Sequence, residues 1–85
     1  MSVKILYFAW VREKTGNAEE ILHVPANVST VAELVSWLKG RGPEYAEAFA
    51  RSEVIRAAVD RRHVSPSADL SGAREVAFFP PVTGG

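Results

Sequence analysis

The chain has 85 residues with an apolar fraction of 47%, which suits one folded domain with a modest core and excludes a disordered chain. It contains no cysteine, so disulfide bonds, cysteine-based zinc sites and an internal cysteine nucleophile are excluded. Ten basic residues balance ten acidic ones, and this charge gives no reason to expect nucleic-acid binding.

The chain begins with a predicted β-hairpin. Residues 3–10 are apolar and β-prone, and residues 20–24 form a second strand that returns beside the first. The intervening residues 11–18 are mostly polar and include Gly16, so they predict a turn, of which a short helical turn can form part.

Two helices are predicted after the hairpin. Thr30 and Glu33 have the spacing of a capping box, and apolar residues follow at helical spacing until Gly40. Pro43 suits the first turn of a second, short helix. The apolar residues expected on one face of these helices are Val31, Leu34, Val35 and Leu38 in the first and Tyr45 and Phe49 in the second.

The remaining residues predict strands again. Residues 54–59 form a third strand, residues 60–62 a turn, and residues 63–64 a short return strand. Residues 65–73 predict a polar loop, and residues 74–79 the last strand. This order predicts an α+β roll, in which one main helix covers one face of a mixed sheet of four to five strands.

The alternation of side chains predicts which sheet face is covered. Lys4 and Glu75 are charged and should point away from the core. Their sides of the two strands carry an apolar patch, consisting of Leu6, Phe8, Ala77 and Phe79, on the uncovered face. We interpret this patch as a docking surface, and the alternative is that the second helix or a loop covers it. The core set is Val3, Ile5, Tyr7, Val76 and Phe78.

The last six residues predict an extended tail on a single domain of residues 1–85. Pro80 and Pro81 lack an N–H group and end sheet pairing, so the chain leaves the domain extended. Gly84 and Gly85 have no Cβ and can enter a narrow cleft with the terminal carbonyl open to attack. This pattern favours a functional tail over a frayed end.

A family resemblance is carried by both ends of the chain. The ending VAFFPPVTGG at 76–85 and the opening ILYFA at 5–9, followed by Arg12, Glu13 and Gly16, closely resemble the small subunits of molybdopterin synthase, the MoaD-type sulfur carriers. The resemblance spans the whole chain in order and length, and the tail is its most specific part.

The resemblance implies a ubiquitin-like β-grasp fold and a sulfur-carrier function. An E1-like adenylating enzyme of the MoeB type would use ATP to activate the Gly85 carboxylate, and a sulfur donor protein would convert it to a thiocarboxylate. The tail would then enter the MoaE-type large subunit of a heterotetramer and donate sulfur to cyclic pyranopterin monophosphate (precursor Z) in molybdenum cofactor biosynthesis.

By the same resemblance, the chain would be non-catalytic alone and bind no cofactor or metal. The catalytic residues are expected on the large subunit, and the partners would be neither nucleic acid nor membrane. Since the sequence has no run long enough to span a bilayer and no evident signal peptide, we expect a cytoplasmic protein.

The resemblance also implies roles for single residues. Gly85 would carry the sulfur, Gly84 would keep the tail slender, and Pro80, Pro81, Val82 and Thr83 would shape it inside the partner. Two loop residues depart from the family, because Asp60 stands where an Asn is frequent and Ala73 where an Asp is common. The predicted partner-binding residues are Leu6, Phe8, Arg12, His63, Ala77 and Phe79, and the roles of Arg12 and Trp10 stay open.

Three other functions stay open at this point. A ubiquitin-like protein modifier would use the same adenylate, but Gly85 would end in an isopeptide bond to a lysine. A sulfur carrier for thiamine or another pathway would deliver its sulfur to a different enzyme. A plain interaction module would function without the last two glycines. His23 and His63 have no metal-binding spacing, so a metal site is not predicted.

Overall fold

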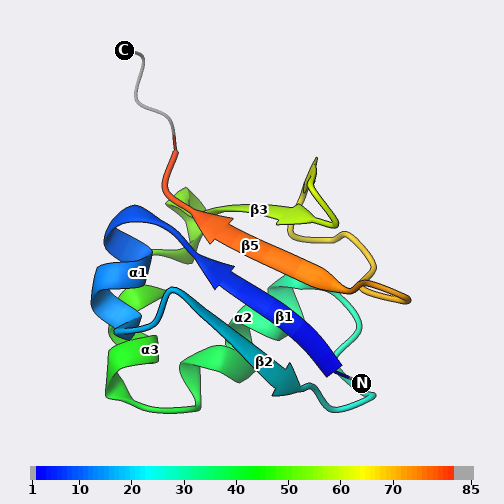
Figure 1. Ribbon diagram of the computed structural model, residues 1–85, viewed down its shortest axis with the longest axis horizontal. Helices are drawn as coiled ribbons and strands as arrows, with labels where there is room; N and C mark the ends of the chain where they lie inside the picture. The colour runs from blue at the N-terminus through cyan, green and yellow to red at the C-terminus, as the bar shows by residue number, and fades with distance from the viewer. Residues whose placement is uncertain (1, 82–85) are drawn as a thin grey trace.

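The computed structural model describes residues 2–81 and shows a five-stranded sheet with the helices on one of its faces (Figure 1). The strands are β1 (Ser2–Tyr7), β2 (Glu19–His23), β3 (Arg56–Val59), β4 (Arg62–Val64) and β5 (Glu75–Phe79). The helices are α1 (Ala9–Thr15), α2 (Val31–Lys39), α3 (Pro43–Ala48) and the short 3₁₀ helix η1 (Ser52–Val54). Within this described part of the chain, no helix is long and apolar enough to cross a bilayer.

The sheet is mixed, as predicted, with the strand order β2-β1-β5-β3-β4. The first and last strands, β1 and β5, lie parallel at its centre, and every other neighbouring pair is antiparallel. The first and last strands are therefore neighbours in the middle of the sheet. The last strand is hydrogen-bonded on both sides, to β1 and to β3.

The first strand is shorter than predicted, because the helical turn that was expected as part of the following turn is a full helix, α1, which already begins at Ala9. The Phe8 carbonyl accepts the N–H groups of Val11 and Arg12, at 3.1 and 3.4 Å, which starts α1. The helix ends at Gly16, whose φ of 81° is left-handed and suits a residue without Cβ. In α1 only Val11 and Thr15 are buried, so its apolar pattern is too short to identify a helix from sequence.

Helix α2 has the predicted boundaries and cap. The Glu33 N–H donates to Thr30 Oγ1 at 3.2 Å, and the Thr30 N–H donates to Glu33 Oε1 at 3.1 Å. This reciprocal pair satisfies two N–H groups that the first helical turn leaves free. The second predicted helix, α3, also forms, and Pro43 lies at its start.

The covered face of the sheet carries the core that the alternation predicted. The Phe49 ring, just after α3, lies 5.1 Å from the Phe78 ring and 6.4 Å from the Tyr7 ring. Helix α3 therefore packs on the same face as α2, and the prediction of one main covering helix was incomplete. The predicted core residues Val3, Ile5, Tyr7, Val76 and Phe78 are each at most 1% exposed.

The other strands differ from the prediction by one or two residues at their ends, since β2 covers 19–23, β4 covers 62–64 and β5 begins at Glu75. The third strand begins only at Arg56, because the Val54 N–H donates to the Arg51 carbonyl and closes a 3₁₀ turn. The loop 65–73 is not merely polar, since Leu70 is 1% exposed and its N–H donates to the Ser29 carbonyl at 2.8 Å. This contact anchors the loop against the residues that precede α2.

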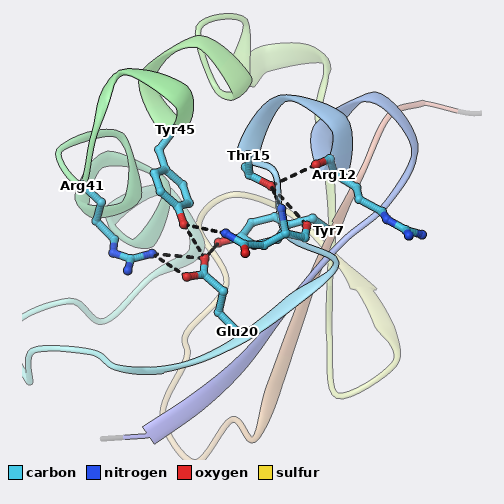
Figure 2. A network of polar contacts seen from close by, with 7 residues as sticks. Tyr7, Arg12, Thr15, Glu20, Arg41 and Tyr45 are labelled. Carbon is cyan, nitrogen blue, oxygen red and sulfur yellow. Dashed lines mark hydrogen bonds and ion pairs between the residues drawn. The ribbon is translucent and has the colours of Figure 1, made fainter.

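A polar network around Glu20 joins the edge of the sheet to the helices (Figure 2). Its carboxylate accepts hydrogen bonds from the Tyr45 hydroxyl at 2.8 Å, the Tyr7 hydroxyl at 2.9 Å and the Arg41 guanidinium at 3.1 Å. Burial alone would raise the pKa of the Glu20 carboxyl, but the hydrogen bonds from Tyr45, Tyr7 and Arg41 outweigh it and lower that pKa. The ionised carboxylate therefore stabilises the fold.

We expect Glu20→Gln to destabilise the protein at neutral pH and to reduce its sensitivity to acid. The folded pKa of Glu20 lies below the ordinary value of 4.5, so its stabilisation is present above that pH and is lost as the pH falls through the folded pKa. At pH 7 the loss should be about 1–3 kcal/mol in the free energy of unfolding. Urea unfolding at several pH values measures both effects.

The exposed residue Glu13 provides the matched control, because it lies on the surface of α1. Glu13→Gln should change the free energy of unfolding by at most about 0.5 kcal/mol. If the two variants showed the same dependence of stability on pH, the Glu20 network would not have the role described.

Candidate functional site

The open face of the sheet carries a row of four side chains across four strands. The register places Leu6 opposite Ala77, Ala77 opposite Ala58, and Ala58 opposite His63. Residues directly opposite each other in a sheet point to the same side, so the row lies on one face. Ala58 and Ala77, the smallest side chains of the row, lie at its centre and are 7% and 8% exposed.

Two phenylalanines lie at the end of the sheet where the chain leaves β5. Phe79 is half-buried, on the same side as Ala77, and its ring lies 5.2 Å from the His63 ring. Phe8 is 48% exposed and keeps an extended backbone, so its side chain falls on the side of Leu6. We call this set the open-face patch: Leu6, Phe8, Ala58, His63, Ala77 and Phe79.

The structure thus brings together five of the six predicted partner-binding residues, and it adds one. Ala58 was not identified from the sequence. The available signal was its position between Arg56 and Asp60, since residues 56, 58 and 60 lie on the same side of an extended strand. In residues 2–81, the helices α1, α2 and α3 leave this face uncovered, because they pack on the other side of the sheet (Figure 1). The patch therefore offers an apolar surface to a partner.

Arg12 lies apart from this patch. It is exposed on α1, and Figure 2 shows its side chain directed away from the Glu20 network. Trp10 is half-buried against the core and lines a groove of about 370 Å³ with Lys14 and Glu47. The structure therefore gives Trp10 a packing role and leaves the role of Arg12 as a prediction.

An open pocket of about 470 Å³ lies where the chain leaves β5. Phe79 and Pro81 form its apolar wall, and Arg56, His63 and Ser65 provide polar groups. Pro80 and Pro81 are both half-buried, so the start of the predicted tail contacts the domain. The other predicted tail residues, Val82, Thr83, Gly84 and Gly85, lie outside the described residues.

The described residues offer a rigid base and a docking surface for a chain end. Strand β5 is held by hydrogen bonds on both sides, and the open-face patch lies beside its last residue. Within residues 2–81, no group of three His, Asp or Glu side chains could hold a metal ion. His23 lies on β2 and His63 on β4, the two opposite edges of the sheet.

Comparison with known proteins identifies the family. Residues 5–85 match the sequence profile of the ThiS family. The chain belongs to the ThiS family. The molybdopterin synthase sulfur carrier subunit of Escherichia coli K12 is 39% identical over 83 residues, which cover 98% of this chain and 99% of that one. The protein of the same name from Dictyostelium discoideum is 33% identical over 84 residues, covering 96% and 94% of the two chains.

Solved structures with the same fold include proteins of Pyrococcus furiosus and Haloferax volcanii. A candidate molybdopterin converting factor subunit 1 of Pyrococcus furiosus superposes with a TM-score of 0.72 at 28% identity, over 96% of this ThiS-family chain and 99% of that chain. The SAMP1 protein of Haloferax volcanii gives a TM-score of 0.74 over the full length of both chains, but its 22% identity shows the fold alone. The fold is the predicted ubiquitin-like β-grasp.

The neighbouring residues Phe78 and Phe79 test the assignment of the two faces. Phe78 is 1% exposed in the core, so Phe78→Ala should reduce the free energy of unfolding by about 3–5 kcal/mol. Phe79 is half-buried on the open face, so Phe79→Ala should cost about 1 kcal/mol. Urea unfolding followed by tryptophan fluorescence measures both, and equal losses would mean that the faces are wrongly assigned.

Proposed function

We propose that this chain is the sulfur-carrier small subunit of molybdopterin synthase. The observation that carries the proposal is the 39% identity, over 98% of this chain, to the Escherichia coli protein of that name. The ThiS-family match also extends to Gly85, the residue on which the chemistry depends. The protein would work in molybdenum cofactor biosynthesis, as the source of the sulfur that the synthase transfers.

The carrier chemistry begins at the Gly85 carboxylate. A carboxylate is a poor electrophile, so an adenylating enzyme uses ATP to form an acyl-adenylate and releases pyrophosphate. Sulfur at the sulfide level, supplied by a sulfur donor protein, then attacks the acyl carbon, and AMP leaves as the carbon–sulfur bond forms. The product is a thiocarboxylate. The carrier itself would bind no cofactor, because the ATP is held and consumed by the activating enzyme.

The thiocarboxylate then serves as a nucleophile on a tether. A sulfur attached to a protein reaches its target at a high effective concentration, which free hydrosulfide in solution does not. Inside the large subunit, it would be transferred to cyclic pyranopterin monophosphate. The general acids and bases for that step would belong to the large subunit, so the carrier alone would not be an enzyme.

The fold of the carrier would supply a docking surface and would set the direction of the tail. The open-face patch is apolar and lies beside the residue from which the tail leaves, so a partner that covers the patch also holds the start of the tail. Pro80 and Pro81 fix two successive φ angles and limit the directions in which the tail can leave. We propose the large subunit and the adenylating enzyme as the partners that use this surface.

The first test compares two versions of the chain, both with an affinity tag at the N-terminus. One ends at Gly85 and the other carries one extra residue after it. Recovered from the native host, the first should contain a fraction heavier by about 16 Da, for oxygen replaced by sulfur, and the second should not. Only the first should support molybdopterin formation with the large subunit, because the extra residue moves the reactive carboxylate.

Other outcomes would contradict the proposal in distinct ways. Sulfur transfer by the extended chain without processing would show that Gly85 is not the carrier residue. Covalent conjugates to other proteins, with no thiocarboxylate, would indicate a protein modifier. Co-purification with a thiazole synthase in place of the large subunit would move the protein to the thiamine pathway.

A further inference from the structure

The hairpin formed by β3 and β4 carries an excess of positive charge. Residues 55–65 contain three arginines and one aspartate, a net charge of +2, whereas the whole chain is neutral at pH 7. The arginines are Arg56, Arg61 and Arg62, and all three are exposed. The β3–β4 hairpin is thus a positively charged part of a chain that is neutral as a whole.

These arginines have no acidic partner among the described residues. The ion pairs of this part of the chain involve Lys4, Lys14, Arg41 and Arg51. The acid of the hairpin, Asp60, is occupied elsewhere, because its carboxylate accepts the N–H groups of Arg74 and Glu75 at 3.0 Å each. The positive charge of the hairpin is therefore available to another molecule.

Arg56 connects this charge to the functional site. It lies opposite Phe79 in the register of β3 and β5, so it projects from the open face at the start of the tail. It also lines the 470 Å³ pocket, together with His63, Ser65 and Pro81. A guanidinium with no acidic partner in the structure thus lies next to an apolar wall that can shield it from water.

We propose that this pocket binds a carboxylate side chain of the synthase large subunit, and that Arg56 is the residue that receives it. The inference rests on the proposed function and deepens it. The guanidinium is a planar fork that can donate two parallel hydrogen bonds to one carboxylate. Once the partner covers the pocket, Phe79 and Pro81 would help to exclude water beside Arg56, which would strengthen a charged hydrogen bond.

Arg61 and Arg62 would act at longer range. They lie at and just after the turn of the hairpin, at the edge of the sheet, where Arg62 is opposite Val59 and so on the side of the covered face. Their charge would add to the positive potential near the pocket without contacting the bound carboxylate. Such a field speeds the encounter with an acidic surface and orients it. The apolar patch would then supply the buried contact, and the Arg56 contact would fix the position of the partner at the start of the tail.

The experiment measures binding of the full chain to the purified large subunit from the same organism. Calorimetric titration at about 0.05 M and about 0.5 M salt compares the wild type with three variants at position 56. Arg56→Gln should weaken binding about tenfold at low salt, and Arg56→Glu about a hundredfold. Arg56→Lys should restore part of the loss, because it returns the charge without the planar fork. Arg56→Gln and Arg56→Glu should also show a smaller dependence on salt, whereas Arg56→Lys, which keeps the charge, should not.

Lys39→Glu is the control for Arg56→Glu, since both replace a positive charge by a negative one. Lys39 lies in the last turn of α2, in the helical layer away from the open face. The affinity of this variant should remain within about twofold of the wild type. Thermal unfolding shows whether each variant is folded. If the charge reversal in Arg56→Glu destabilises the chain, the affinity of Arg56→Gln decides the test.

Two results would overturn the inference while the proposed function stands. One is an unchanged affinity and salt dependence in Arg56→Glu. The other, from the same titration repeated with the adenylating enzyme, is a loss of affinity for that enzyme with no loss of affinity for the large subunit. If the wild-type chain failed to bind the large subunit at all, the proposed function itself would fail, and this inference with it.

Discussion

The parallel pairing of β1 and β5 is the constraint on which the rest of this structure depends. It places the first and the last strand side by side at the centre of the sheet. The residues that follow β5 therefore leave from a strand that is hydrogen-bonded on both sides. An edge strand would leave the tail on a support that can fray. A parallel pair also needs a long crossover, and the helices provide it on one face only.

That one-sided crossover divides the molecule into a stable layer and an interacting layer. The helices bury one set of alternating side chains, and Phe49 and Phe78 are in edge-to-face contact there. At the edge of this layer, Glu20 accepts hydrogen bonds from the hydroxyls of Tyr7 and Tyr45. The other set faces outward and includes two nearly buried alanines flanked by larger groups. Stability and recognition therefore use opposite faces of the same strands, and a residue on the open face can change without emptying the core.

The distribution of charge follows the same division. Pairs such as Lys4–Glu19 and Arg41–Glu20 are satisfied within the chain, at 3.6 and 3.1 Å, whereas the arginines of the β3–β4 hairpin have no such partner in residues 2–81. An apolar patch bordered by unpaired charge is typical of a surface that binds a protein, since the patch gives buried area and the charge gives orientation. The tail leaves the domain where these two features meet.

The sequence by itself determined three features, because each depends on residues close together in the chain. Alternation determined the two faces of the central strands, and the Thr30–Glu33 spacing determined the capped helix α2. The two terminal glycines gave the tail its resemblance to a sulfur carrier. Tertiary structure alone decided the features that depend on distant residues. Helix α1 forms because Val11 and Thr15 find a core to enter. Ala58 and Arg56 join the site only because the sheet places β3 beside β5, and no local pattern records which strands become neighbours.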